Sequence, residues 1–260
     1  MVRPMNRGEL LHTFDLTGRV AIVTGASRGI GRAIAGGFAA MGAHVVVASR
    51  KADACDAAVA EIRGEGGSAL SVPTHVGDPD RLTALVDATV AEFGGVDIVV
   101  NNAANPLALP IGSITTDAIA KSWEANLRGP LFLVQAALPH LRASDHAAIV
   151  NVTTAGVYTS GQYVSMYVAA KSALTAMTRA MAAELAGDGI RANALAPGTV
   201  GTDMVFNTPE AFQQAAVDAQ LIKRMATPAE MVPPALFLAS DASSFMTGHT
   251  LIVDGGMTVH

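Results

Sequence analysis

The sequence has one cysteine, no long apolar run and no excess of basic residues, and each lack excludes a class of protein. Cys55 stands alone among 260 residues, which excludes an intrachain disulfide and fits a reducing compartment such as the cytoplasm. No apolar run reaches the roughly 20 residues of a membrane-spanning helix, and the N-terminus lacks the apolar region of a secretory signal. The net charge of −5 gives no electrostatic reason to expect nucleic acid or an anionic membrane as a partner.

Apolar residues, in contrast, make up half of the chain, which is enough for one large and well-covered α/β domain. A short β-branched apolar run predicts a buried strand at 19–24, and further strands are predicted at 44–49, 69–73, 97–100, 147–152, 190–195 and 249–253. The composition between them predicts helices at 32–41, 53–63, 79–93, 115–126, 131–141, 165–185 and 228–240. Because strands and helices alternate, we expect a single-domain, doubly wound parallel sheet (Rossmann-like) with helices on both faces.

Two stretches stand outside this alternation. Residues 1–13 are predicted to be a flexible N-terminal extension, and the Rossmann-like domain is predicted to occupy residues 14–260. The polar stretch 201–225 is predicted to be an irregular lid over a site at the edge of the sheet.

A glycine-rich turn follows the first predicted strand and leads directly into the first helix. Gly25, Gly29 and Gly31 stand there in a Gly-x-x-x-Gly-x-Gly pattern. Glycine lets the backbone approach a pyrophosphate closely, and a helix N-terminus offers free N–H groups to it. A simple turn with positive φ would use glycine as well, but three glycines between a strand and a helix favour a dinucleotide site.

The second predicted strand ends in Ser49, Arg50 and Lys51, without an acidic residue. A carboxylate at this position would accept hydrogen bonds from the adenosine ribose 2′-OH and would repel a 2′-phosphate. Arg28, within the glycine turn, adds a further cation. Cations without a carboxylate favour NADP(H) as the cofactor, and NAD(H) is the alternative if these cations are only solvated.

Tyr167 and Lys171 are four residues apart in a predicted helix, so they lie on one face, one turn from each other. A free phenol has a pKa of about 10, which makes it a poor acid or base at neutral pH. A neighbouring ammonium favours the phenolate and is expected to lower that pKa. The pair therefore predicts a proton donor and acceptor, whereas the alternative is a packing tyrosine beside a solvated lysine.

Polar residues follow two further strands, at the edge where ligands bind to an open parallel sheet. The pair Asn101–Asn102 ends the fourth predicted strand, and Thr153–Thr154 ends the fifth. Asn126 falls inside a predicted helix, where asparagine is unfavourable, so we expect it to have a specific role.

These motifs, in this order, resemble the classical short-chain dehydrogenase/reductase family over residues 14–256. The turn TGASRGIG resembles the family's cofactor turn, and FLASDASSFMTGHTLIVDGG resembles its C-terminal signature. The resemblance implies an NAD(P)-dependent oxidoreductase that acts on a CH–OH group, and it implies a homotetramer.

By position, the resemblance implies that Tyr167 is the general acid and base and that Lys171 binds the nicotinamide ribose. It implies that Asn126 holds a water linking Lys171 to solvent, and that Thr154 binds the substrate oxygen. No metal ligands are predicted. The implied cofactor-binding residues are Gly25, Ser27, Arg28, Gly29, Ile30, Gly31, Ser49, Arg50, Val76, Asn102, Ala103, Tyr167, Lys171, Pro197, Gly198, Val200 and Thr202.

The chain departs from the family pattern at three positions. Thr154 stands where the family usually has serine, Ala104 where it has glycine, and His75 where it often has aspartate. The threonine hydroxyl can still hydrogen-bond a carbonyl, but its methyl group crowds the pocket. The other hydroxyls that could replace serine are those of Thr153, Ser160 and Ser165.

The predicted function is hydride transfer between NADP(H) and a small-molecule carbonyl or secondary alcohol of moderate hydrophobicity. The substrate pocket is expected to draw on Tyr158, Tyr163, the loop 105–110 and the lid, with Thr154 at the reacting oxygen. A 3-oxoacyl thioester reductase and an NAD-dependent secondary alcohol dehydrogenase are alternatives within the family. A dinucleotide-binding protein without turnover is the alternative from another class, and the presence of both Tyr167 and Lys171 argues against it.

Overall fold

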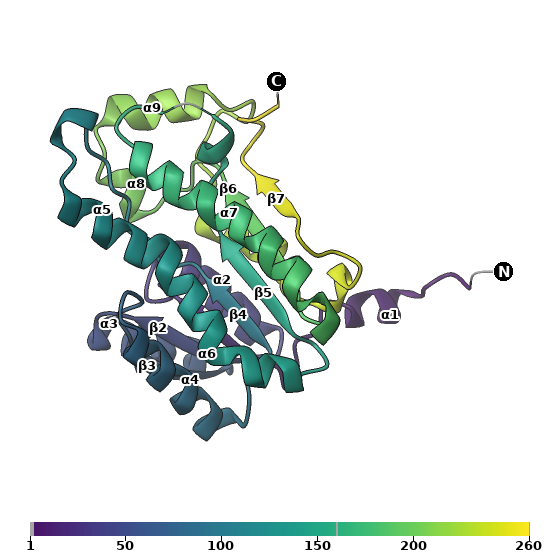
Figure 1. Cartoon of the computed structure of the whole chain (residues 1–260). Coiled ribbons are helices and arrows are strands. Elements are labelled where there is room, and N and C mark those ends of the chain that lie inside the picture. The colour runs from purple at the N-terminus through teal and green to yellow at the C-terminus, as the bar shows by residue number, and fades with distance from the viewer. Residues whose placement is uncertain (1–2, 160, 260) are drawn as a thin grey trace.

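Seven short runs, the central ones rich in valine and isoleucine, form one parallel sheet in the computed structural model, which describes residues 3–159 and 161–259 (Figure 1). The strand order is β3-β2-β1-β4-β5-β6-β7. The central strands are buried on both faces, which is why their sequences read as continuous apolar runs. The strands are β1 Val20–Thr24, β2 His44–Ser49, β3 Ser68–Pro73, β4 Ile98–Asn101, β5 Ala148–Val152, β6 Arg191–Pro197 and β7 Thr250–Val253.

Helices cover both faces of the sheet, as the alternating pattern predicts (Figure 1). One core cluster joins the sheet to α2 Gly29–Ala40, α3 Ala52–Gly64 and α10 Val232–Ala239. A second cluster, on the other face, joins it to α4 Pro79–Phe93, α6 Gly129–Ala143 and α7 Ser165–Leu185. The prediction of a doubly wound, Rossmann-like sheet is therefore confirmed. No helix within the described ranges is long and apolar enough to cross a membrane.

The helices predicted at 115–126 and 131–141 are one continuous helical segment. It consists of α5 Thr116–Trp123, a π-helical turn η2 Glu124–Arg128, and α6. A Cβ on Gly129 would lie 2.5 Å from the carbonyl oxygen of Val76, so the backbones pack closely at this point. Pro130 directly follows the π-helical turn, in the first turn of α6, and the helical segment continues through it. Asn126 lies buried in the π-helical turn, a feature that often marks functional sites.

The lid stretch 201–225 is not irregular, so that prediction is wrong. It contains two helices, α8 Asp203–Phe206 and α9 Glu210–Asp218. Polar residues stabilise the turn between them, since the Gln213 side chain donates to the carbonyl oxygens of Phe206 at 3.4 Å and Thr208 at 2.8 Å. The high polar content of this stretch therefore reflects helices with one solvated face rather than a lack of helices.

The N-terminal extension includes a short helix that the composition did not predict. α1 Arg7–His12 begins with a capping box in which Asn6 and Glu9 satisfy each other's backbone N–H groups. The helix buries none of its residues and projects away from the sheet (Figure 1). The remaining short helices are η1 Ile111–Ser113, η3 Ala155–Tyr158, η4 Ala186–Asp188, η5 Pro228–Met231 and η6 Asp241–Ser243.

Candidate active site

A cleft of about 990 Å³ opens at the edge of the sheet where the parallel strands end. The glycine turn, the strand ends, the start of α7 and the lid helices line it. Every residue predicted for catalysis or cofactor binding lines this cleft, except Gly31 and Asn126. The cleft therefore brings together residues that are up to 177 positions apart, from Gly25 to Thr202.

The glycine turn is held open by its own backbone and by Asn102. Gly25 and Gly29 have φ values of 65° and 58°, in the left-handed region that glycine adopts without strain. A Cβ on Gly31 would lie 2.3 Å from Nδ2 of Asn102, which donates to the carbonyl oxygen of Thr24 at 2.8 Å. Gly31 therefore allows Asn102 to pack against the turn. This contact explains why Gly31 lies behind the wall of the cleft and does not line it.

The two arginines predicted near the adenosine end have different surroundings. Nη1 of Arg28 donates to Oδ2 of Asp203 at 2.9 Å and so joins the glycine turn to the lid. Arg50 is exposed on the cleft wall, and no ion pair involves it among the residues that the structure describes. Beside it, Oγ of Ser27 donates to Oγ of Ser49 at 3.0 Å. Among the described residues that line this end of the cleft, Arg50 has no carboxylate partner, whereas Arg28 is paired with Asp203.

His75 and Ala104, two of the departures from the family pattern, both line the cleft. Nδ1 of His75 lies 3.1 Å from the backbone N–H of Gly77 and accepts its hydrogen bond, which stabilises the turn after β3. A neutral ring that accepts at Nδ1 carries its proton on Nε2 and is a donor there. His75 therefore has a structural contact of its own at a position where the family often has aspartate.

Thr154 follows β5 and caps the short helix η3. Its Oγ1 accepts a hydrogen bond from the backbone N–H of Gly156 at 3.1 Å, so its own hydroxyl proton remains available to a ligand in the cleft. Thr153 cannot replace it, because its buried hydroxyl donates to a backbone carbonyl of β6 at 3.2 Å. Ser165 is exposed and does not line the cleft, and Ser160 lies outside the described residues. Among the candidate hydroxyls that the structure describes, Thr154 is the best placed.

Tyr167 and Lys171 both face the cleft from the first turns of α7. The Lys171 side chain is 1% exposed, and its Nζ donates to the carbonyl oxygen of Val152 at 2.7 Å. Burial lowers the pKa of Lys171 to about 7, because the ammonium loses its hydration. Burial also raises the pKa of Tyr167 to about 12, although part of the ring remains accessible in the cleft.

The expectation that Lys171 lowers the pKa of Tyr167 is therefore wrong for this structure. Removing the phenolate from water outweighs any attraction to the lysine, which is itself only partly charged near pH 7. Tyr167 consequently keeps its proton at neutral pH and can act as a donor there.

Asn126 lies behind the cleft and orders one of its loops. Its Nδ2 donates to the carbonyl oxygen of Asn105 at 2.8 Å, and its Oδ1 accepts from the backbone N–H of Asn105 at 3.1 Å. Nδ2 also lies 3.1 Å from Oγ of Ser122. Each side-chain contact recorded for Asn126 in the described residues is thus with Asn105 or Ser122, and its role in linking Lys171 to water stays a prediction.

The substrate end of the cleft is lined by the loop 105–110 and by the lid, as expected from the sequence, and by the C-terminal segment. Tyr158 and Tyr163 were expected to line the pocket, but neither lies among the lining residues of the cleft. Apolar residues of the lid and the C-terminal segment line it instead, because α8 and α9 fold over this end. They are Met204, Val205, Phe212, Ala216 and Met257. Neither helix was predicted, so no periodic pattern directed these side chains to the cleft.

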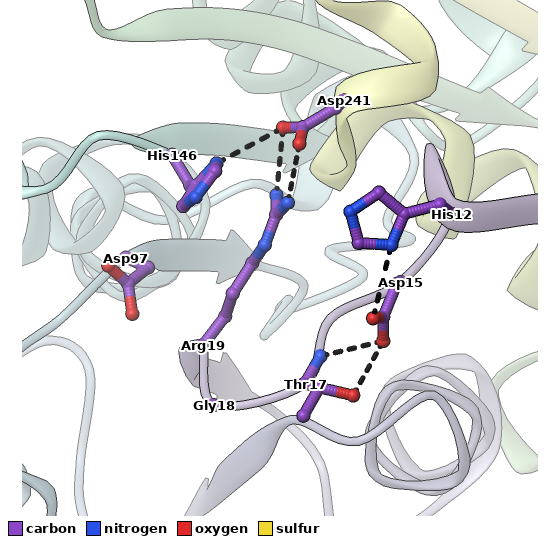
Figure 2. Close-up of a pocket in the computed structure, with 8 residues that line it drawn as sticks. All are labelled: His12, Asp15, Thr17, Gly18, Arg19, Asp97, His146 and Asp241. Carbon is purple, nitrogen blue, oxygen red and sulfur yellow. Dashed lines mark hydrogen bonds and ion pairs between the residues drawn. The ribbon is translucent and has the colours of Figure 1, made fainter. Parts of the chain in front are cut away.

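A second hollow, of about 280 Å³, lies at the opposite edge of the sheet, before β1 and β4 begin (Figure 2). Both nitrogens at the end of the Arg19 side chain donate to Asp241, at 3.0 and 2.7 Å, and Nδ1 of His146 lies 3.3 Å from the same carboxylate. Figure 2 shows a separate pair between His12 and Asp15. Arg19 and Asp241 pair with each other here, and the described residues contain no cluster of three metal ligands. We therefore assign a structural role to this hollow.

Replacing Asp241 with asparagine is expected to lower the free energy of unfolding by roughly 1–2 kcal/mol at pH 7, because the buried Arg19 would lose its charged partner. Partial burial raises the pKa of Asp241, but Arg19 and His146 together hold it below its ordinary value. Stability from this pair is therefore present above about pH 4 and is lost as the pH falls through the lowered pKa.

Urea denaturation from pH 7 to pH 3 would measure this difference. The exposed pair Arg142–Asp188 is the matched control, and Asp188→Asn should cost less than about 1 kcal/mol. Equal losses in Asp241→Asn and Asp188→Asn, or a difference independent of pH, would contradict the assignment.

Comparison with known proteins shows similarity along nearly the whole chain. The family model described as enoyl-(acyl carrier protein) reductase matches residues 25–258. The short-chain dehydrogenase/reductase SDRA of Arabidopsis thaliana is 40% identical over 93% of this chain and 95% of its own length. Cis-4-hydroxycyclohexanecarboxylate dehydrogenase of Sinomonas cyclohexanicum is 41% identical over 92% of this chain and 96% of its own length.

Solved structures agree with these sequence matches. The crystal structure of a 3-oxoacyl (acyl-carrier-protein) reductase from Agrobacterium tumefaciens C58 with NADP bound has a TM-score of 0.88 to this chain. It is 35% identical, and the match covers 94% of this chain and 96% of that one. Neither the sequence nor the structural match leaves a large part of either protein unaccounted for.

Proposed function

The chain belongs to the short-chain dehydrogenase/reductase family, and on that basis we propose that it transfers a hydride between NADP(H) and a neutral carbonyl or secondary alcohol. One observation carries the proposal. The phenol of Tyr167, the ammonium of Lys171 and the hydroxyl of Thr154 line the same cleft as the glycine turn. A proton donor and a hydrogen-bond donor thus lie in the cleft that would hold the cofactor.

The chain's residues fit a dinucleotide. Gly25 and Gly29 give the turn its positive φ values, and the N-terminus of α2, where free N–H groups favour a pyrophosphate, begins at the same turn. Pro197, Gly198 and Val200 line the other end of the cleft, below the lid. When bound there, the nicotinamide cofactor supplies or accepts the hydride.

The proton and the substrate oxygen are handled by this chain's own side chains. Tyr167 is protonated at neutral pH and donates its proton as negative charge develops on the substrate oxygen. Thr154, which already accepts from Gly156, donates its hydroxyl proton to the same oxygen. Lys171, buried one helical turn beyond Tyr167 and bound to Val152, contributes positive potential whenever it is protonated.

The distribution of cations supports a neutral substrate of moderate hydrophobicity. Arg28 is paired with Asp203, and Lys121 is paired with Asp117 at 2.7 Å. Arg50 lies at the adenosine end, and the substrate end is lined largely by apolar side chains. A carboxylate on the substrate would therefore meet no uncommitted cation among the described residues at that end. A 3-oxoacyl thioester, which carries no charge at its reacting end, is the second candidate.

The choice of NADP(H) over NAD(H) depends on Arg50, which stands exposed at the end of β2 with no acidic residue beside it in the sequence. We expect the parent protein to reduce neutral ketones with a higher kcat/KM for NADPH than for NADH. Arg50→Ala should lower the preference for NADPH roughly 10-fold, because one charge-assisted contact to the 2′-phosphate is lost.

The assay pairs a panel of ketones, their carboxylated analogues and a 3-oxoacyl thioester with both nicotinamides. Lys51→Ala is the matched control, since Lys51 is an exposed neighbour that does not line the cleft. A parent that prefers NADH would contradict the cofactor proposal. Tight NADPH binding without turnover across the whole panel would instead favour a non-catalytic dinucleotide-binding protein.

A homotetramer in the cytoplasm is part of the same proposal, by family membership. The fully exposed ring of Phe245, close before the edge strand β7, supports burial of this surface in an assembly. Leu131 of the long helix α6 is exposed as well.

A further inference from the structure

Tyr163 has an unusual backbone conformation just before α7. Its φ of 67° lies in the left-handed region, and it is the one residue other than glycine with such a φ in the described part of the chain. A bulky side chain adopts this conformation at an energetic cost, so the surrounding contacts must hold it in place. Backbone strain of this kind is common at functional sites, so the contacts that hold Tyr163 in place indicate what it could do.

The contacts of Tyr163 join three segments around the substrate end of the cleft. Its ring meets the ring of Phe212, on lid helix α9, edge to face, with the centroids 5.9 Å apart and the planes at 86°. Its carbonyl oxygen accepts a hydrogen bond from the backbone N–H of Leu109 at 2.7 Å. Tyr163 thus holds the lid on one side and the loop 105–110 on the other.

The position of this aromatic pair indicates what it controls. Phe212 lines the cleft, and so does Val164, the residue after Tyr163. The other lid helix, α8, is held at the cofactor end by the pair between Asp203 and Arg28. The lid is therefore fastened by an ion pair over the cofactor end and by two aromatic rings over the substrate end.

An edge-to-face contact between two half-exposed rings is weak enough to open and close. The side chain of Phe212 has no hydrogen-bonding group, so separating the two rings breaks an apolar contact and no hydrogen bond between them. A contact of this kind restricts the space available to a substrate while the lid is closed.

We propose that Tyr163 and Phe212 form an aromatic gate that determines which substrates the enzyme accepts, by limiting the bulk of the group attached to the carbonyl carbon. The proposal rests on the proposed carbonyl reduction and adds a specificity determinant to it. Tyr163 acts as a positioning residue, because its strained backbone aims the ring at α9. Phe212 forms the wall that a substrate would contact.

The gate is tested with Phe212→Ala and with Tyr163→Asn, since asparagine tolerates positive φ but supplies no aromatic ring. Both variants should raise kcat/KM for a bulky aryl ketone relative to a small alkyl ketone by roughly 2- to 10-fold. The change should appear mainly in KM, and the Kd for NADPH should stay within about 2-fold of the parent value. Tyr163→Phe keeps the ring and is the matched control, with an unchanged ratio.

Hydrogen exchange supplies a readout that does not depend on turnover. The amides of α9 and the amide of Leu109 should exchange faster in Phe212→Ala and Tyr163→Asn than in Tyr163→Phe or the parent. An unchanged size ratio in an active parent background would overturn the gate. If the parent reduces no ketone, the proposed function fails, and hydrogen exchange alone tests whether the two rings hold the lid. Unchanged exchange in Phe212→Ala and Tyr163→Asn would then overturn the gate.

Discussion

Replacing Tyr167 with phenylalanine is expected to lower kcat for carbonyl reduction by roughly 10²- to 10⁴-fold, the range associated with loss of a general acid. The substitution removes a single oxygen atom from a ring in the first turn of α7, so the fold and the glycine turn should be unaffected. The Kd for NADPH should stay close to the parent value, because the pyrophosphate end of the cleft does not involve the phenol. Single-turnover reduction, followed by loss of NADPH absorbance, measures the effect.

The raised pKa of Tyr167 gives this prediction a pH dependence. With a pKa of about 12, the phenol keeps its proton across the neutral range, so reduction should not lose its acid below about pH 10. Alcohol oxidation needs the phenolate, and its rate should rise as the pH becomes alkaline.

Tyr158→Phe is the matched control, because Tyr158 is half-exposed and does not line the cleft. Its activity should match that of the parent protein. Near-parent activity in Tyr167→Phe would remove Tyr167 as the acid, and with it the mechanism.

Replacing Thr154 with valine is expected to lower kcat/KM by roughly 10²- to 10³-fold, the effect of losing one donor to a developing oxyanion. Valine keeps the shape of threonine but has no hydroxyl, so it loses both the proposed bond to substrate and the acceptor for the N–H of Gly156. Loss of that acceptor could disturb η3, and a second variant is therefore needed.

Thr154→Ser retains the hydroxyl and the bond to Gly156 and should stay within about 3-fold of the parent, with the methyl group removed from the pocket. Comparing the two variants by steady-state kinetics separates the hydroxyl from the methyl group. Equal activity in Thr154→Val and Thr154→Ser would show that another group binds the substrate oxygen.

Local sequence was a good guide wherever one stretch of chain carried the whole signal. The buried strands β1 and β5 were recognised because burial on both faces requires an unbroken apolar run. The glycine turn was recognised because strand, turn and helix are consecutive. The two lid helices are not evident from the sequence, because α8 and α9 are short and depend on side-chain hydrogen bonds such as those of Gln213 and Thr208.

Contacts between segments far apart in the chain could not be predicted from a local pattern. The pKa of Tyr167 was expected to fall because Lys171 is one turn away, but the packing around both groups raises it. Arg28 lines the cleft, as expected of a cofactor-binding residue, and it also binds Asp203, 175 positions along the chain, which no local pattern indicates. Asn126 holds Asn105 and Ser122 through its side chain, and its expected role in linking Lys171 to water stays a prediction.

The sequence by itself determined the order of strands and helices along the chain, the glycine turn and the spacing of Tyr167 and Lys171. Each of these properties depends only on residues close together in the chain, whose pattern matches the period of a helix, the apolar run of a buried strand or the needs of a turn. Only the tertiary structure decided which groups are charged, which hydroxyl is available to a ligand, and which side chains close the cleft. Those properties depend on the removal of water and on contacts between segments remote in the chain, and neither is encoded in any local pattern.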